Sequence, residues 1–330
     1  MCAVYKKTIS LIIPVYNEEE TIEIFLKHVR PVLLREDYFF EFIFVNDGSN
    51  DDTFLALLTA RKSDQRIKII DLSRNFGKEY ALAAGFKYAQ GDAIIPIDVD
   101  LQDSPCLIST FLRKWEEGYE MVIGVRTVRS SDSFFKRVTA NLFYNLFNIA
   151  SKEKIICNAG DFRLLDRKVV EVLNLLPERV RFTKGLYAWA GFRQVQLPYE
   201  RAARAAGKSK WSFWGLWNFA LDGITGFSTL PLRIWSYIGF ICASIGFIYA
   251  AFLVFRTLFL GRDIPGYPSL MVVILCVGGL ILTSLGIIGE YLGRIFVETK
   301  QRPLYIVRDS IGFKTEADQS ASVCPPSDSP

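Results

Sequence analysis

The chain has 330 residues, of which 50% are hydrophobic and 22% charged, with a formal net charge of +4. This composition is richer in apolar residues than that of an ordinary soluble protein, so part of the chain is expected to lie in a membrane. The charge is too small to indicate a nucleic-acid-binding protein, and no base-reading motif is present. The single histidine, His28, argues against a Ser-His-Asp or Cys-His nucleophile and leaves acid–base chemistry to carboxylates.

Apolar, β-rich runs alternate with segments of helical periodicity over the first 125 residues. The predicted strands are Ile9–Val15, Phe39–Val45, Ile67–Ile70, Ala93–Ile97 and Met121–Val125. The predicted helices between them are Glu19–Val29, Thr53–Ala60, Glu79–Ala89 and Pro105–Glu117. Such alternation indicates βαβ units and a mostly parallel sheet. Ligands bind beyond the carboxyl ends of the strands in such sheets, so the residues that follow each strand are candidates for a site.

Three aspartates follow the fourth predicted strand: Asp98, Asp100 and Asp103. Along an extended strand, alternate residues project from one face roughly 7 Å apart, so Asp98 and Asp100 can reach one ligand together. Hard cations such as Mg²⁺ or Mn²⁺ bind carboxylate and phosphate oxygens, which predicts a metal site that bridges a diphosphate. The alternative is a polar loop of solvated acids that caps the helix beginning near Pro105.

A second polar turn, Asn46-Asp47-Gly48-Ser49, follows the second predicted strand. Alone it is an ordinary turn, although a strand-end carboxylate at Asp47 can accept a hydrogen bond from a nucleobase N–H. Together with the opening Ile13-Pro14-Val15-Tyr16-Asn17-Glu18 and with Asp98 and Asp100, the turn resembles the nucleotide-sugar-binding domain of inverting family-two glycosyltransferases. The resemblance implies an α/β GT-A fold, which is Rossmann-like, and a nucleotide-sugar donor.

The segment Gly160-Asp161-Phe162-Arg163 places another acid after a small-residue turn. One interpretation is a cap for the helix predicted over Asp166–Leu176, but Asp166 is better placed for that purpose. In the family, this segment resembles the one whose aspartate is the catalytic base, so the resemblance implies that role for Asp161. A phosphate monoester acceptor is mostly dianionic at neutral pH, so Asp161 could instead orient the acceptor.

Basic residues lead into an aromatic segment after residue 200. Arg201, Arg204, Lys208 and Lys210 precede the ring-rich segment 211–231, which is predicted to be amphipathic and to lie at a membrane interface. These basic residues could attract anionic lipid and hold a lipid phosphate. The alternative is a solvated basic loop.

Two apolar stretches, about 232–260 and 270–290, are each long enough to cross a membrane and predict a two-helix hairpin. Arg233, Lys300 and Arg302 lie on one side of it, together with Arg294, whereas the connector 261–268 carries one charge of each sign. The positive-inside rule then predicts that both termini are cytoplasmic. Glu290 and Arg294 are predicted to pair at the interface.

The predicted organisation is a cytoplasmic GT-A catalytic domain over 1–210, an interfacial segment over 211–231, transmembrane helices within 232–296 and a cytoplasmic tail over 297–330. Within the tail, residues 302–307 suggest a short returning strand. The end from residue 316 is rich in Ser, Pro and Asp and is predicted to be disordered.

This order of features resembles the polyprenyl-phosphate glycosyltransferases, closest to the bactoprenol glucosyltransferase group, over about residues 8–308. Matching segments include Ser73–Glu79, Pro96–Asp103 and Gly289–Arg294. The resemblance implies transfer of glucose from UDP-glucose to undecaprenyl phosphate at the cytoplasmic membrane face, with Mg²⁺ or Mn²⁺, by a homo-oligomer. The sequence departs from that of the group at Ala205-Ala206, beside the basic residues expected to contact phosphate.

The expected site follows from these parts. Asp98 and Asp100 would hold the metal, Asp161 would act in catalysis, and Asp47 would hold uracil. The residues expected to contact the substrates are Asp47, Asp98, Gln102, Arg126, Arg163, Arg201, Lys208 and Lys210.

Two other functions are weighed against this one. A processive polysaccharide synthase would share the sheet and the paired aspartates, but the Q-x-x-R-W motif of that family is absent and two spans are too few to line a pore. A catalytically silent membrane scaffold that only binds a nucleotide sugar would not need Asp98, Asp100 and Asp161 together.

Overall fold

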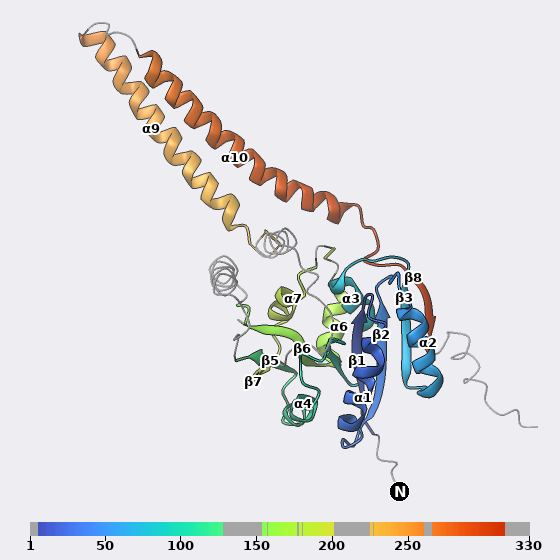
Figure 1. Cartoon of the computed structure of the whole chain (residues 1–330). Helices are drawn as coiled ribbons and strands as arrows, with labels where there is room; N and C mark the ends of the chain where they lie inside the picture. The colour runs from blue at the N-terminus through green and yellow to red at the C-terminus, as the bar shows by residue number, and fades with distance from the viewer. Residues whose placement is uncertain are drawn as a thin grey trace, which may run out of the picture.

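The computed structural model describes residues 6–127, 154–156, 158–176, 178–179, 181–200, 225–226, 228–260 and 266–313. They form an α/β domain from which two long helices extend as a hairpin (Figure 1). The strands are β1 (Thr8–Val15), β2 (Phe39–Asn46), β3 (Ile67–Leu72), β4 (Ala93–Pro96), β5 (Met121–Arg126), β6 (Ala159–Asp166), β7 (Gln194–Tyr199) and β8 (Val307–Ile311). The helices of the domain are α1 (Thr21–Leu33), α2 (Thr53–Ser63), α3 (Lys78–Tyr88), α4 (Leu107–Glu116), α6 (Arg167–Leu175) and α7 (Thr183–Ala190).

The eight strands form one sheet in the order β7-β5-β6-β4-β1-β2-β3-β8. Four pairings are parallel, namely β1–β2, β1–β4, β2–β3 and β5–β7. The pairings β3–β8, β4–β6 and β5–β6 are antiparallel. The strands and helices predicted over residues 9–125 are confirmed within a few residues. The sheet is nevertheless mixed, because β6 and β8 enter it in the opposite direction.

The returning strand lies further along the chain than predicted. Residues 301–306 are irregular, and β8 begins at Val307. Pro303 lacks the N–H that a strand interior needs, which explains why regular pairing starts later. A single bond continues the contact beyond the strand: Ser73 N–H donates to Ile306 O at 2.9 Å.

Both faces of the sheet are covered by helices, because its strands carry apolar side chains on each face. Successive side chains of a strand point to opposite faces, so Leu11 and Ile12 of β1 enter different cores. Leu11 packs in the core that includes residues of α1, α2 and α4, and Ile12 in the core that includes residues of α3, α6 and α7. This three-layer arrangement leaves the polar loops at the strand ends.

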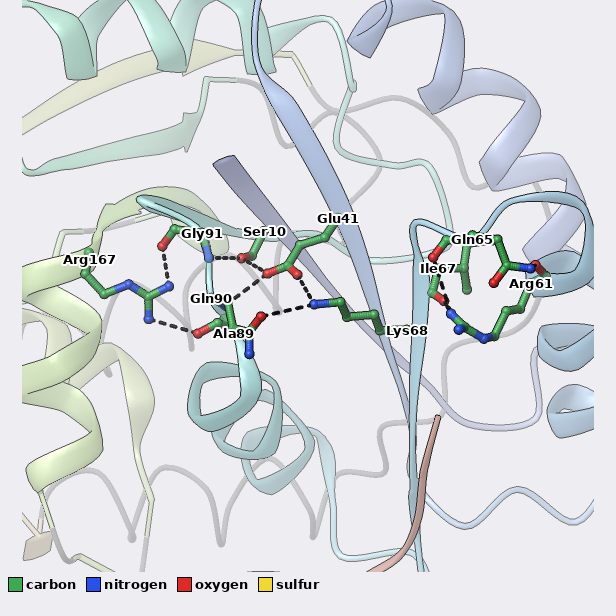
Figure 2. Close-up of polar contacts among 10 residues, drawn as sticks. All are labelled: Ser10, Glu41, Arg61, Gln65, Ile67, Lys68, Ala89, Gln90, Gly91 and Arg167. Atoms are coloured by element: carbon green, nitrogen blue, oxygen red, sulfur yellow. Dashed lines mark hydrogen bonds and ion pairs between the residues drawn. The ribbon is translucent and has the colours of Figure 1, made fainter. Parts of the chain in front are cut away.

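At the amino ends of the strands, the buried Glu41 carboxylate accepts hydrogen bonds from separate segments (Figure 2). The Ser10 hydroxyl donates to it, Gln90 N–H donates at 3.0 Å, and Lys68 Nζ lies 2.6 Å away. Gly91 N–H donates in turn to Ser10 Oγ at 2.8 Å. Because a buried charge is tolerated only when paired and hydrogen-bonded, this network holds the turn between α3 and β4 against β1 and β2.

The hairpin consists of α9 (Leu230–Leu260) and α10 (Tyr267–Thr299), which run beside each other (Figure 1). Each contains a candidate membrane span by length and composition, Leu230–Tyr249 and Cys276–Thr299, and neither span is buried within the chain. Large apolar side chains are exposed along both helices. Such surface is unfavourable in water, so the hairpin is suited to a lipid environment.

The second helix is longer than the apolar stretch in its sequence. It continues past residue 290 to Thr299, because its last turns contain polar residues but no proline. The predicted pair within it is confirmed: Arg294 Nη2 lies 2.9 Å from Glu290 Oε1. The helix therefore carries polar side chains to the surface of the α/β domain.

The end of α10 contacts the loop between α6 and α7. Arg179 N–H donates to Glu298 Oε1 at 2.7 Å, and the Arg179 guanidinium donates from Nε to Arg302 O at 2.9 Å. On its other side, the Tyr80 hydroxyl of α3 donates to Arg179 O at 2.9 Å. This loop thus links the hairpin to the first turns of α3.

Candidate active site

Two of the predicted site residues share one cation at the carboxyl edge of the central strands. Lys78 Nζ lies 2.7 Å from Asp98 Oδ1 and 2.8 Å from Asp161 Oδ2. Lys78 is the first residue of α3, after Gly77, whose φ of +108° is open to glycine but strained for other residues. The sharp turn at Gly77 lets the chain start a helix beside the strand ends and brings the ammonium between the two carboxylates.

The antiparallel strand β6 explains why Asp161 lies near Asp98. Ala93 pairs with Asp166 and Ile94 pairs with Leu165. Because the two strands are antiparallel, the start of β6 lies beside the end of β4, and Asp161 near that start comes close to Asp98 in the loop that follows β4. Asp166 does cap α6 as predicted, since its carboxylate accepts a hydrogen bond from Lys168 N–H at 3.0 Å.

The charges around Lys78 and Asp161 favour the ionised forms of both. Burial alone would raise the pKa of Asp161, but the cations of Lys78 and Lys184 hold this pKa well below its usual range. Burial likewise opposes the charge of Lys78, and the two carboxylates nevertheless raise its pKa. Asp161 is therefore an anion at neutral pH and a weak proton acceptor.

Glu79 is the next residue on α3 and has a different electrostatic environment. Burial and the negative charge of Asp161 raise its pKa to about 7, against the opposing effects of a hydrogen bond from Thr183 and the charge of Lys78. The pKa of Glu79 is therefore raised and that of Asp161 lowered, although the two acids lie in the same charged region. Lys78 and Glu79 belong to the matching segment Ser73–Glu79, but the sequence alone predicted no role for either residue.

Asp47 lies in the loop after β2 and is buried. Its two carboxylate oxygens accept hydrogen bonds from the backbone N–H groups of Phe76 at 2.8 Å and Gly77 at 2.9 Å. Burial raises the pKa of Asp47, and these two bonds together with the charge of Arg74 oppose the rise. Asp47 thus holds the loop between β3 and α3 in place and keeps lone pairs for a further donor.

Gly48 makes this contact between loops possible. Its φ is +64°, and a Cβ atom on it would lie 2.6 Å from Arg74 Cα and from Asn75 N. Only a residue without a side chain allows such an approach of two backbones. The loops after β2 and β3 therefore form one unit around Asp47.

The paired aspartates lie in a turn, which corrects the expectation of an extended strand. β4 ends at Pro96, and Leu101 has a φ of +55°, which is uncommon for a residue with a side chain. Gln102 N–H donates to Asp100 Oδ1 at 3.1 Å, and Gln102 Oε1 is buried without a hydrogen-bond partner in the described structure. Asp98 and Asp100 therefore do not project from one face of an extended strand as expected. Both belong to the loop that follows β4.

Asp103, the third of the three aspartates that follow β4, is almost fully buried and contacts residues other than Lys78. It accepts a hydrogen bond from the Tyr199 hydroxyl, and Arg126 Nη2 lies 3.8 Å from it. The Arg126 guanidinium also packs close to Gly160, where a Cβ atom would lie 2.7 Å from Nη2. Arg126 is thereby placed next to Asp161 while it compensates the charge of Asp103.

Arg163 is on the same strand as Asp161, two residues further along, and is 3% exposed. Its Nη2 donates to Gly160 O at 2.6 Å, and the guanidinium carbon lies 3.9 Å from the centre of the Tyr187 ring. Residues two apart along a strand point to the same face, so Arg163 and Asp161 lie on one side of the sheet.

The basic residues predicted to contact phosphate, Arg201, Lys208 and Lys210, lie outside the described residues. The same applies to most of the interfacial segment 211–231 and to the predicted disordered end from residue 316.

The residues expected to hold a metal supply two carboxylates, those of Asp98 and Asp100. Within the described ranges, no group of three or more His, Cys, Asp or Glu residues is arranged to hold a metal ion. Mg²⁺ is commonly bound by one or two carboxylates together with water and substrate phosphates, so Asp98 and Asp100 fit such an ion when a diphosphate supplies further oxygens. The attraction of Asp98 for the Lys78 cation shows that the position favours positive charge.

Comparison with known proteins supports the same family. Residues 10–173 match glycosyl transferase family 2, and residues 230–295 match the GtrB C-terminal hairpin. A glycosyltransferase of Synechocystis, itself uncharacterised, is 51% identical over 93% of this chain and 96% of its own. The SfII prophage-derived bactoprenol glucosyl transferase of Shigella flexneri is 50% identical over 92% of this chain and 98% of its own.

Among solved structures, a glucosyl-3-phosphoglycerate synthase of Mycobacterium tuberculosis in complex with Mn²⁺, UDP-glucose and phosphoglyceric acid has a TM-score of 0.43 and 20% identity, over 66% of this chain and 78% of that one. A mannosyltransferase of Pyrobaculum calidifontis in complex with GDP-mannose and Mn²⁺ has a TM-score of 0.40 and 18% identity, over 59% and 56%. From the matches along nearly its whole length, the chain belongs to glycosyl transferase family 2, among the members that carry the GtrB C-terminal hairpin.

Proposed function

We propose that this protein transfers glucose from UDP-glucose to undecaprenyl phosphate, as a bactoprenol glucosyltransferase. The observation that carries the proposal is the identity of about half of all residues to bactoprenol glucosyl transferases of Shigella flexneri and its phages, over more than nine tenths of the chain. Asp98 and Asp161, brought together at one edge of the sheet, supply a plausible reaction centre for it.

The acceptor needs little activation. The second pKa of a phosphate monoester is near 6, so at neutral pH its oxygens are nucleophiles without loss of a proton. One phosphate oxygen forms the new bond to the anomeric carbon while the bond from that carbon to the UDP oxygen breaks, and UDP leaves with the electron pair. A single displacement inverts the configuration.

Asp161 then acts as a positioning group for the acceptor. The lowered pKa of Asp161 makes it a poor base, whereas its charge and its contact with Lys78 fix the local arrangement of charges. Of the two roles considered from the sequence, orientation of the acceptor therefore agrees better with this environment.

The donor is expected to bind along the loops after β2, β3 and β4. Asp47 would contact uracil with its remaining lone pairs, and Gln102 and Arg126 would line the sugar diphosphate. Mg²⁺ or Mn²⁺ held by Asp98 and Asp100 would neutralise charge on the departing diphosphate. Lys78 carries positive charge next to Asp98 and would add to this neutralisation.

The hairpin would hold this site at the cytoplasmic face of the membrane. The start of the first helix and the end of the second carry basic residues, including Arg233 and Lys300, which the positive-inside rule assigns to the cytoplasmic side. The lipid acceptor would lie in the same membrane. Assembly into a homo-oligomer stays a prediction from the resemblance.

The test uses purified full-length protein in detergent with undecaprenyl phosphate and Mg²⁺ or Mn²⁺. Radiolabelled UDP-glucose, UDP-N-acetylglucosamine, UDP-galactose and GDP-mannose are offered separately, and label is followed into the organic phase. Metal-dependent lipid label from UDP-glucose is expected. Polymer formation would indicate a processive synthase, and donor binding without turnover would indicate a scaffold.

A further inference from the structure

Arg163 is a buried cation that forms no direct ion pair with a described residue, although the charges of Asp161 and Glu79 act on it from a greater distance. None of the described carboxylate oxygens lies within 4.0 Å of its nitrogens, and its Nε has no hydrogen-bond partner in the described structure. Its contacts are Gly160 O, the face of the Tyr187 ring and, at 4.0 Å, the sulfur of Met121. A buried guanidinium with no directly paired anion and an Nε that donates to nothing in the described structure is costly, which suggests that a ligand supplies an anionic oxygen.

A small cavity adjoins this guanidinium. Its volume is about 20 Å³, enough for one water-sized group, and Arg163, Tyr187, Lys184, Lys154 and Gln194 contribute to its wall. The Tyr187 hydroxyl is buried and also lacks a hydrogen-bond partner in the part of the chain that the structure describes. Among the described residues, the lining contains three cations and a hydroxyl donor and no acidic side chain, so the cavity is suited to an anionic oxygen.

The cavity lies beside the candidate catalytic aspartate. Ala159 and Arg163, which both line it, flank Asp161 along β6 on the same face of the sheet. Lys184 lies close enough to lower the pKa of Asp161 while it lines the cavity. An anion bound there would therefore sit next to Asp161, at the carboxyl edge where Asp98 also lies.

We propose that Arg163, Tyr187 and Lys184 form a subsite for the phosphate group of the acceptor. One phosphate oxygen would enter the cavity and accept hydrogen bonds from Arg163 Nε and the Tyr187 hydroxyl, and the charge of Lys184 would attract the rest of the group. The identification of this phosphate as the lipid acceptor rests on the proposed function. Arg163 was expected to contact a substrate, whereas Lys184 and Tyr187 were not anticipated.

Tyr187→Phe is the most informative variant. It removes a single hydroxyl that has no partner within the described protein, so a purely structural role predicts unchanged or slightly higher thermal stability and unchanged ligand binding. A phosphate subsite predicts weaker binding of the phosphate.

Lys184→Gln removes a charge from the lining without replacing a core side chain. Tyr119→Phe is a matched control, because Tyr119 also lies under a guanidinium, that of Arg193 at 4.6 Å, away from the cavity lining.

Binding to the full-length protein in detergent is measured separately for undecaprenyl phosphate, undecaprenol and inorganic phosphate, and KM values are measured for lipid and UDP-glucose. For undecaprenyl phosphate, we expect about 3- to 10-fold weaker binding in Tyr187→Phe and at least 10-fold weaker binding in Lys184→Gln. Tyr119→Phe and the KM for UDP-glucose are expected to be unchanged. Undecaprenol is expected to bind all variants alike.

The outcomes separate the subsite from the function. Wild-type binding of undecaprenyl phosphate by both variants would overturn the subsite, even if glucose transfer is intact. Variant-dependent binding of undecaprenyl phosphate without glucose transfer would support the subsite and overturn the proposed function. Variant-dependent binding of inorganic phosphate, with lipid phosphate unaffected, would overturn the assignment to the acceptor.

Discussion

Asp161 of β6 and Asp98 of the loop after β4 contact one ammonium group, that of Lys78, at 2.8 and 2.7 Å. The two acids are 63 residues apart in the chain and belong to segments that run in opposite directions. Each contributes a negative charge to a small region, and Lys78 makes their proximity tolerable.

The shared lysine leads to the first prediction. Lys78→Met should leave Asp98 and Asp161 without their common cation and reduce kcat by about 100-fold or more, the usual effect of removing a group that stabilises charge in a reaction centre. The measurement is steady-state transfer of label from UDP-glucose to undecaprenyl phosphate.

Lys68→Met is the matched control for this change. Lys68 also pairs with a carboxylate, Glu41, but at the amino edge of the sheet. Its loss should lower thermal stability and leave kcat near that of the unaltered protein. Equal turnover of Lys78→Met and the unaltered protein would show that Lys78 has no part in the reaction.

The metal assignment leads to the second prediction. Asp98→Asn and Asp100→Asn should each abolish measurable transfer and weaken Mn²⁺ binding in the presence of UDP, because an amide is a poorer ligand than a carboxylate for a hard cation. Mn²⁺ binding is measured by electron paramagnetic resonance. Asp92→Asn is the control, since Asp92 lies at the other end of β4 and accepts a hydrogen bond from Thr8 N–H at 2.8 Å. Full turnover in either site variant would remove the metal assignment.

Glu79 gives a pH-dependent prediction. Its pKa of about 7 in the folded protein exceeds its ordinary value of 4.5, so folding favours the protonated carboxyl. This contribution to stability is present below about pH 4.5 and is lost as the pH rises through about 7. The stability of Glu79→Gln should therefore rise relative to that of the unaltered protein as the pH increases from 5, and should exceed it at pH 8 by about 1 to 3 kcal/mol.

Thermal unfolding of both proteins between pH 5 and pH 8 measures this difference. The gap in Tm should open as the pH rises. Parallel Tm curves across this range would mean that the Glu79 carboxyl does not titrate with a raised pKa.

Gly48 gives the fourth prediction. Gly48→Ala places a side chain in the left-handed region and against the Arg74–Asn75 backbone. It should lower the free energy of unfolding by about 1 to 2 kcal/mol and, by displacing the loop that Asp47 holds, raise the KM for UDP-glucose several-fold.

Gly118→Ala controls for the backbone effect. Gly118 also has a positive φ, +89°, but the nearest atom to an added Cβ is Arg193 Nη1 at 3.7 Å. It should lose stability through backbone strain alone, and therefore less than Gly48→Ala, while the KM for UDP-glucose stays constant. A similar KM change in both variants would mean that the Gly48 effect is not specific to the donor loops.

The regular part of the fold was predictable because its signals are local. Apolar runs and helical periodicity gave β1 to β5 and the helices between them, and Asp166 was correctly identified as the cap of α6. The strand β6 was not predicted, because its sequence was interpreted through the Gly-Asp-Phe-Arg motif rather than through pairing. Its antiparallel entry depends on contacts between distant segments, which no local pattern encodes.

The site was predictable to the same extent. Residues after strands could be assigned to one edge, which placed Asp47 and Asp98 there, whereas Asp161 was assigned only from the Gly-Asp-Phe-Arg motif. Lys78 was missed because it follows no strand directly, and its position depends on the sharp turn at Gly77. The buried Arg163 and Tyr187 could not be distinguished from ordinary core residues, because an unsatisfied polar atom is visible only when its surroundings are known.

The last strand of the sheet is made after the membrane hairpin. β8 pairs with β3, so the chain leaves the α/β domain, forms α9 and α10, and returns to complete an edge of the same sheet. The hairpin is therefore an insertion within a domain rather than an appendage at its end. During synthesis, β3 would stay unpaired at this edge until both helices and β8 had been made. Completion of the catalytic domain would therefore follow synthesis of the membrane hairpin. A chain shortened before α9 would lose its anchor and also expose the edge of β3 to pairing with other chains.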